Sequence, residues 1–177
     1  MNLSKVKNSI SNLELSAKRK LGSVKLIAVS KVQPNEKIKV VLEEGHRCFG
    51  ENRVQEALSK WPNFRNDYDN IELHLIGPLQ TNKARQAFEL FNVIQTLDRV
   101  KLARSFASLA QEQGFCPSLF IQVNTGEEPQ KAGIFSNKLD LFVKECRSMD
   151  LPIEGLMCIP PVNEEPSLHF SLLNRRN

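Results

Sequence analysis

The sequence predicts an α/β fold of the (β/α)8 TIM-barrel type, with about six βα units present. Three observations support this. Short apolar runs alternate with amphipathic helical patterns along the 177 residues, which is typical of βα units on a parallel sheet. The first predicted turn after a strand, "SKVQPNE", contains no glycine, whereas a flat dinucleotide-binding sheet usually carries a glycine-rich turn there. Polar residues gather at the carboxyl ends of the predicted strands, where barrels place their active sites.

The chain opens with an amphipathic helix predicted over 2–20, followed by Gly22 as a stop signal. Apolar runs of strand length then alternate with helical patterns. The predicted strands are 25–30, 47–50, 71–77, 93–97, 118–124 and 153–160. The predicted helices are 35–44, 52–61, 81–91, 99–113 and 137–148, and a last helix begins near Glu165. No interdomain linker is evident, so we expect a single domain over 1–177.

The composition is that of an ordinary globular protein, with 41% hydrophobic and 25% charged residues and a net charge of +4. Basic residues are interspersed with acidic ones rather than with aromatic ones, so we expect no nucleic-acid partner. No signal-peptide core or membrane-length apolar window occurs, so we expect no membrane partner and a cytoplasmic protein. The four cysteines lack metal-ligand or redox spacing and are expected to be free thiols in a reducing compartment.

One lysine, Lys31, directly follows the first apolar run, "KLIAVS". An isolated lysine after a strand is usually a solvated charge. At the rim of a barrel, however, a partly desolvated amine is nucleophilic and can form an imine with an aldehyde or ketone. Class I aldolases and pyridoxal phosphate proteins both use this chemistry. The lysine alone leaves both interpretations open.

Further polar residues lie at the other predicted strand ends. Asn52 follows the second strand, His74 lies in the third, and Asn124 ends the fifth. In a barrel, the carboxyl ends of these strands converge on one face. His74 has two interpretations, as a ligand contact or as a hydrogen-bonded core histidine. Asn124 either points into the site or caps the following loop.

Five motifs follow one another along the chain. They are "AVSKVQP" (28–34), "FGENRVQEA" (49–57), "HLIGPLQTNKAR" (74–85), "QVNTGEEPQKAGI" (122–134) and "GLMCIPP" (155–161). In this order they resemble the pyridoxal phosphate homeostasis protein family, also called the proline synthetase co-transcribed family. Members of that family are single-domain barrels similar to the N-terminal domain of alanine racemase. The resemblance extends from about Val24 to Pro161, which is most of the chain.

The resemblance implies a pyridoxal phosphate-binding protein of intracellular cofactor homeostasis, without catalytic turnover. It makes Lys31 the amine that holds the cofactor as an aldimine, and it places Asn52 and His74 beside the cofactor. Asn124 is the fourth candidate cofactor-binding residue. We expect neither catalytic residues nor a metal site. The roles of Lys83 and Lys131, which fall inside the motifs, stay open.

The chain departs from the family at its end. Family members continue beyond the "GLMCIPP" strand with two further strands, which supply phosphate-binding groups and an arginine near the pyridine ring. This sequence ends at Asn177. We therefore expect a truncated barrel of six strands, with unpaired first and last strands and weaker retention of the phosphate. We expect a monomer, with edge-to-edge self-association as the alternative.

Other function classes stay open beside this one. The first is a non-functional fragment that lacks the phosphate site. An amino-acid racemase would need a second acid–base group on the opposite cofactor face, which in alanine racemase is a tyrosine from a further domain. The only tyrosine here is Tyr68, in the polar stretch "NFRNDYDN", so racemase activity is disfavoured. A class I aldolase is weaker still, because no acid–base partner lies near Lys31 in the sequence.

Overall fold

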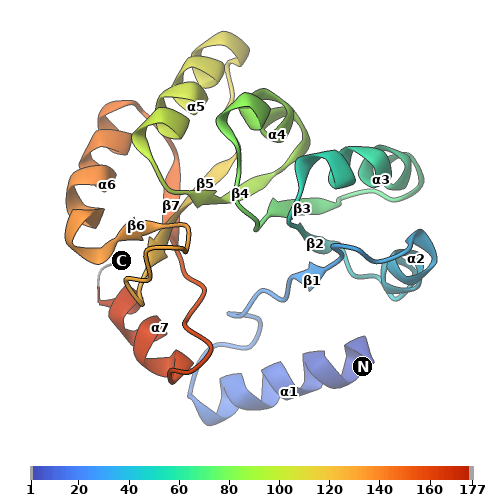
Figure 1. The fold of residues 1–177 in the computed structure, drawn as a ribbon. Helices are drawn as coiled ribbons and strands as arrows, with labels where there is room; N and C mark the ends of the chain where they lie inside the picture. Colours follow the sequence, from blue (N-terminus) through green and yellow to red (C-terminus); the bar gives the residue numbers. More distant parts are fainter. Residues whose placement is uncertain (1, 176–177) are drawn as a thin grey trace.

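The computed structural model describes residues 2–175, which form one curved parallel sheet with helices along its outer side (Figure 1). The strands are β1 (Ala28–Val29), β2 (Cys48–Glu51), β3 (Glu72–Leu75), β4 (Val93–Leu97), β5 (Ser118–Asn124), β6 (Ile134–Phe135) and β7 (Ile153–Met157). The α-helices are α1 (Leu3–Ser16), α2 (Asn35–Glu43), α3 (Val54–Asp67), α4 (Ala84–Leu90), α5 (Val100–Gln113), α6 (Leu139–Ser148) and α7 (Pro166–Asn174). Short 3-10 turns, η1 (Thr81–Lys83) and η2 (Ser136–Lys138), precede α4 and α6.

Six strand–helix units make up this architecture: β1–α2, β2–α3, β3–α4, β4–α5, β5–α6 and β7–α7. The α/β barrel-type fold predicted from the sequence is therefore confirmed. The strands pair in chain order from β1 to β5, and β7 then pairs with β5. Within the described residues β1 pairs only with β2, and β7 pairs only with β5. The sheet therefore does not close on itself, and α1 and α7 lie beside its open side (Figure 1).

The hydrophobic core lies between the outer face of the sheet and the helices. Successive side chains of a strand point to opposite faces, so Leu73 and Leu75 pack outward and are fully buried. Glu72 and His74 alternate with them and face the barrel interior. The outer layer is completed by large buried side chains of the helices, among them Trp61, Phe88 and Phe106. This alternation directs polar side chains of the strands into the interior.

The first helix is shorter than predicted: it ends at Ser16 rather than near residue 20. Lys18 has a φ of 53°, and a helix cannot continue through this left-handed conformation. The Glu14 carboxylate, near the end of α1, accepts hydrogen bonds from the backbone N–H groups of Gly22 and Val24 at 2.9 and 2.7 Å. Because the helix ends early, these hydrogen bonds can connect α1 to the segment that leads into β1.

Helix α3 is longer than predicted, because it continues through Pro62 to Asp67 instead of ending at residue 61. Proline inside a helix removes one backbone hydrogen bond. Burial compensates for this loss: the Trp61 ring lies 4.8 Å from Phe49 and 5.5 Å from Phe64, centroid to centroid.

No helix in the described part of the chain is long and apolar enough to cross a membrane.

The largest differences between the observed strands and the sequence prediction concern β1 and β6. The first covers 28–29 instead of 25–30, since β1 has a ladder partner on one side alone within residues 2–175. The prediction of six strands missed β6, which pairs in parallel with the end of β5. Gly133, before β6, has a φ of 119°, and a Cβ there would lie 2.7 Å from the backbone nitrogen of Asn124. Glycine therefore allows this segment to approach β5. The four cysteines are free, as expected.

Candidate functional site

Lys31 lies in the turn between β1 and α2, at the carboxyl end of the sheet. It is exposed, and residues 2–175 offer its side chain no hydrogen bond or ion pair. The next residue, Val32, has a φ of 60°, which is strained for a β-branched side chain. The amine is thus free to react, on a backbone that needs support from neighbouring elements.

That support comes from β2 and α3. The Ser30 hydroxyl donates to Glu51 Oε1 at 2.9 Å, and Lys60 Nζ donates to the Ser30 carbonyl at 3.2 Å. On the other side of Lys31, the backbone N–H of Val32 donates to the Glu56 carboxylate. Both neighbours of Lys31 are therefore anchored while its own side chain is left free.

Glu51 is the buried centre of this support. It is fully buried, and its Oε1 also accepts from Trp61 Nε1 at 3.1 Å and lies 3.5 Å from Lys60 Nζ. A buried carboxylate is costly unless it is paired and hydrogen-bonded. Its Oε2 has no partner among the described residues. Although Glu51 ends β2 at the carboxyl face, its side chain turns outward under α3 and supports the Lys31 turn from the outer side of the sheet.

Asn52 follows β2 on the same face of the sheet. Its backbone packs against Gly77, where an added Cβ would lie 2.3 Å from the Asn52 carbonyl oxygen. Asn52 lines a cleft of about 550 Å³ between the loops after β2, β3 and β4. Arg53, Lys83 and Arg99 also line it. The cleft therefore carries positive charge, and Lys83, whose role the sequence left open, lies here.

Asn124 ends β5 and uses its amide to shape the next loop. Its Nδ2 donates to the Glu128 carbonyl at 2.7 Å, and its Oδ1 accepts from the Glu128 N–H at 3.2 Å. Lys131 in the same loop forms an ion pair with the Glu128 carboxylate. Asn124 therefore caps its loop, the second of the two interpretations that the sequence allowed.

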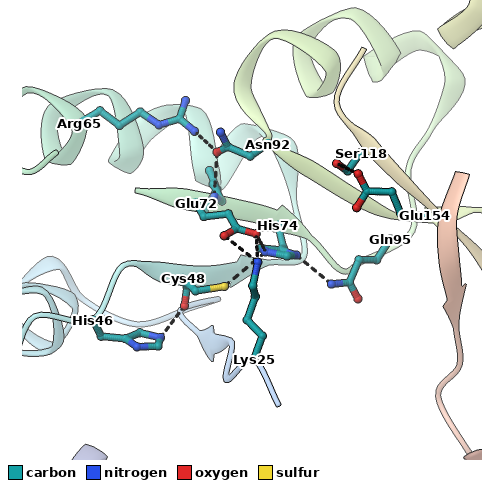
Figure 2. Close-up of polar contacts among 11 residues, drawn as sticks. Lys25, His46, Cys48, Arg65, Glu72, His74, Asn92, Gln95, Ser118 and Glu154 are labelled. Atoms are coloured by element: carbon teal, nitrogen blue, oxygen red, sulfur yellow. Dashed lines mark hydrogen bonds and ion pairs between the residues drawn. The ribbon is translucent and has the colours of Figure 1, made fainter. Parts of the chain in front are cut away.

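His74 lies deeper, in the barrel interior, with its ring directed toward the amino ends of the strands (Figure 2). Its Nε2 lies 2.9 Å from Glu72 Oε1 and 3.3 Å from Cys48 Sγ, and Gln95 Nε2 lies 2.9 Å from its Nδ1. Since the Gln95 amide donates to Nδ1, the proton is on Nε2 and is donated to Glu72. Both ring nitrogens are thus occupied by protein partners.

A second lysine belongs to this interior cluster. Lys25 Nζ donates to both Glu72 carboxylate oxygens, at 2.7 and 2.9 Å (Figure 2). Burial raises the pKa of Glu72, but the hydrogen bonds from Lys25 and His74 outweigh this and leave it below its usual value. The hydrogen bond to Glu72 raises the pKa of Lys25. Lys25 is therefore a bound cation rather than a free amine.

Burial also decides the protonation of the two other members of the cluster. It lowers the pKa of His74, against the opposing effect of Glu72, so the ring is neutral near pH 7. It raises the pKa of the Cys48 thiol to about 11, and the nearby Glu72 charge adds to this. Cys48 is consequently a protonated thiol in this state.

The structure thus separates the four predicted site residues into two groups. Lys31, Asn52 and Asn124 lie at the carboxyl ends of β1, β2 and β5, the face where barrels place their sites. His74 contacts residues near the opposite ends of the strands. Sequence reasoning missed the anchors Glu56 and Lys60; their i, i+4 spacing on α3 was the available signal, but it does not reveal the Val32 contact.

Comparison with known proteins agrees with this geometry. A family model described as "Alanine racemase, N-terminal domain" matches residues 2–175. The pyridoxal phosphate homeostasis protein of Pasteurella multocida is 36% identical over 165 residues, covering 93% of this chain and 71% of that protein. The protein of the same name from Escherichia coli K12 is 34% identical over 173 residues, covering 97% and 74%.

Solved structures show the same relationship. PipY of Synechococcus elongatus PCC7942, without pyridoxal phosphate, has 37% identity and a TM-score of 0.78, with 90% of this chain and 74% of that chain covered. PipY with pyridoxal phosphate bound has 32% identity and a TM-score of 0.79, covering 96% and 81%. Alanine racemase of Clostridium difficile 630, at 13% identity and a TM-score of 0.68, shares the fold. The chain belongs to the family of the pyridoxal phosphate homeostasis proteins, within the alanine racemase N-terminal domain family.

Proposed function

We propose that this chain binds pyridoxal phosphate through Lys31 and serves intracellular homeostasis of this cofactor. The observation that carries the proposal is the free amine of Lys31 on a turn anchored at both neighbouring residues. The name of the relatives and the cofactor bound to PipY support it. When bound, pyridoxal phosphate supplies an aldehyde that condenses with a primary amine.

The residues of the carboxyl face fit both ends of this cofactor. Lys31 offers the amine for the aldehyde. Arg53 and Lys83, in the cleft beside Asn52, put positive charge on the face that a phosphate ester would approach. Arg99 is less available, because its guanidinium donates to Asp98 and to the Leu79 carbonyl.

The four predicted residues take different roles in this proposal. Lys31 attaches the cofactor, and Asn52 lies next to it at the end of the neighbouring strand. Asn124 orients the loop after β5, which borders the same face. His74 has a structural role in the barrel interior, below the carboxyl face, because both of its ring nitrogens already have partners.

We infer that the bound cofactor is held without turnover. Racemisation would need an acid–base group on the second face of the cofactor. Tyr68 lies at the end of α3, where the Arg47 guanidinium sits 5.5 Å from its ring centroid. Arg47 precedes β2, so this tyrosine is at the amino ends of the strands, away from Lys31. This position favours a binding protein over a racemase.

The remaining expectations belong to the same proposal. A monomer in the cytoplasm, with no nucleic-acid or membrane partner, accords with the net charge of +4 and with four free cysteines. Self-association through the edges β1 and β7 is the alternative that sedimentation of the purified chain would reveal. The other function class, a fragment that folds without binding the cofactor, is decided by the following experiment.

The test combines pyridoxal phosphate with borohydride reduction, which makes the attachment to an amine permanent, and locates the modified lysine by peptide mass spectrometry. We expect modification of Lys31 at substoichiometric cofactor, and its loss in Lys31→Ala. Lys39→Ala, an exposed lysine on α2, is the matched control and should behave as wild type. A folded wild-type chain with no modification, or with modification spread evenly over its lysines, would contradict the proposal.

A further inference from the structure

A second cleft, of about 400 Å³, lies at the opposite end of the barrel, between α1 and the segments leading into β1, β2 and β3. Its lining includes Lys25, Cys48 and Glu72. Cys48 and His74 are both buried, whereas the Glu72 side chain is 32% exposed. The cleft therefore connects solvent with the interior cluster of Figure 2.

Cys48, Glu72 and His74 offer three ligand atoms of the types that zinc prefers: a sulfur, a carboxylate oxygen and an imidazole nitrogen. These atoms lie within 4.8 Å of one another. His74 Nε2 is 3.3 Å from Cys48 Sγ and 2.9 Å from Glu72 Oε1. Around tetrahedral zinc, with bonds of about 2.0–2.3 Å, such atoms are roughly 3.3–3.6 Å apart. The two separations from His74 Nε2 are within a few tenths of an ångström of these values. The third, between Cys48 and Glu72, is at most 4.8 Å and is set by how far the Glu72 carboxylate turns toward the sulfur.

We propose that Cys48, Glu72 and His74 bind a divalent transition-metal ion of the zinc class, at the amino end of the barrel. Three protein ligands leave one position open for water, and the adjoining cleft supplies it. The mixed sulfur, nitrogen and oxygen set disfavours Mg²⁺ and Ca²⁺, which prefer oxygen ligands alone.

In this structure the positive charge next to the Glu72 carboxylate is supplied by Lys25. Its ammonium group donates hydrogen bonds to both oxygens of Glu72. It thus occupies the position beside the carboxylate that a bound metal ion would take. The Lys25 side chain is 61% exposed, so it can turn into solvent when a metal ion takes over the carboxylate. Metal binding therefore competes with the Lys25–Glu72 ion pair.

The protons and hydrogen bonds of the exchange can be balanced. Cys48 loses its thiol proton to solvent and binds as thiolate. The proton of His74 moves from Nε2 to Nδ1, which frees Nε2 for the metal. Turning the side-chain amide of Gln95 over then presents its oxygen to the Nδ1 proton. An oxygen acceptor behind the ligating imidazole is the usual outer partner of a metal-bound histidine.

The test uses Co²⁺ as a spectroscopic probe, because cobalt bound to thiolate gives a charge-transfer absorption band that nitrogen and oxygen ligands do not produce. We expect this band on adding Co²⁺ to the full chain, and its loss on adding one equivalent of Zn²⁺. Cys48→Ser, a nearly isosteric change, should abolish the band. Cys116→Ser removes a thiol outside the cluster and should retain it.

Two further variants separate a built site from adventitious binding to a thiol. Lys25→Met removes the competing cation, and we expect about fivefold tighter Co²⁺ binding, since an exposed ion pair opposes it. Gln95→Leu removes the outer partner of His74, and we expect roughly tenfold weaker binding. The proposal is overturned by the absence of a thiolate band in wild type, by its persistence in Cys48→Ser, or by weaker binding in Lys25→Met. None of these outcomes depends on cofactor binding at Lys31.

Discussion

Lys25 and Lys31 flank the same short strand, β1, and the structure treats them in opposite ways. At the amino end, the side chain of Lys25 is bound to Glu72. At the carboxyl end, the residues on both sides of Lys31 are anchored by Glu51, Glu56 and Lys60, while its side chain is left free. The difference between the two lysines is that Lys31 has its neighbouring residues fixed by hydrogen bonds and its amine unpaired, whereas the amine of Lys25 is engaged in an ion pair.

Exchanging each lysine for arginine gives the sharpest test of this contrast. Arginine keeps the charge but has no primary amine, so Lys31→Arg should lose attachment of pyridoxal phosphate completely. Lys25→Arg should keep it, because a guanidinium can still pair with Glu72. Absorbance titration with pyridoxal phosphate measures both variants. Equal loss in the two variants would show that the ends of β1 are not functionally distinct.

The next largest effect concerns the support behind the Lys31 turn. Trp61 is fully buried, packs between Phe49 and Phe64 and donates to Glu51. We expect Trp61→Ala to lower the free energy of unfolding by about 3–5 kcal/mol, measured by urea denaturation. Trp61→Phe is the matched control: it keeps most of the packing and should cost less, because the hydrogen bond to Glu51 is its main loss. Similar costs for the two variants would argue against packing as the main contribution.

The smallest expected effect lies at the amino end, where Glu14 ties α1 to the lead-in of β1. The hydrogen bond from the Gly22 backbone, together with those of Val24 and Ser23, holds the pKa of Glu14 below its usual value against the opposing effect of burial. Its contribution to stability is therefore present above the pKa of the unfolded state and is lost as the pH falls through the lower folded-state pKa.

Thermal unfolding as a function of pH tests this link. Glu14→Gln should unfold at a lower temperature than wild type near pH 7, and the difference should shrink as the medium becomes acidic. The effect is small because the N–H groups of the exposed residues Gly22 and Val24 can turn to water. A difference that is constant with pH would assign the stabilisation to packing of the side chain instead of its charge.

Much of the fold could be predicted because its signals are local. The alternation of apolar runs and helical patterns identified six βα units, and the strand ends located Lys31, Asn52 and Asn124 on one face. The errors arose where distant contacts override local preference. Helix α3 passes through Pro62 because Trp61 and Phe64, on either side of it, are both buried. The strand β6 is an apolar pair, Ile134–Phe135, too short to be recognised as a strand in the sequence, and it exists because β5 offers a partner.

The sequence by itself determined the order of the elements, the strand ends that meet at one face and the five motifs that mark the family. Only the tertiary structure decided what each polar group does. It showed that Glu51 turns outward to support Lys31, that Asn124 caps its own loop and that His74 joins Cys48 and Glu72. The physical reason is that periodicity is set by neighbours along the chain, whereas hydrogen-bond and ion-pair partners come from strands that meet when the sheet forms.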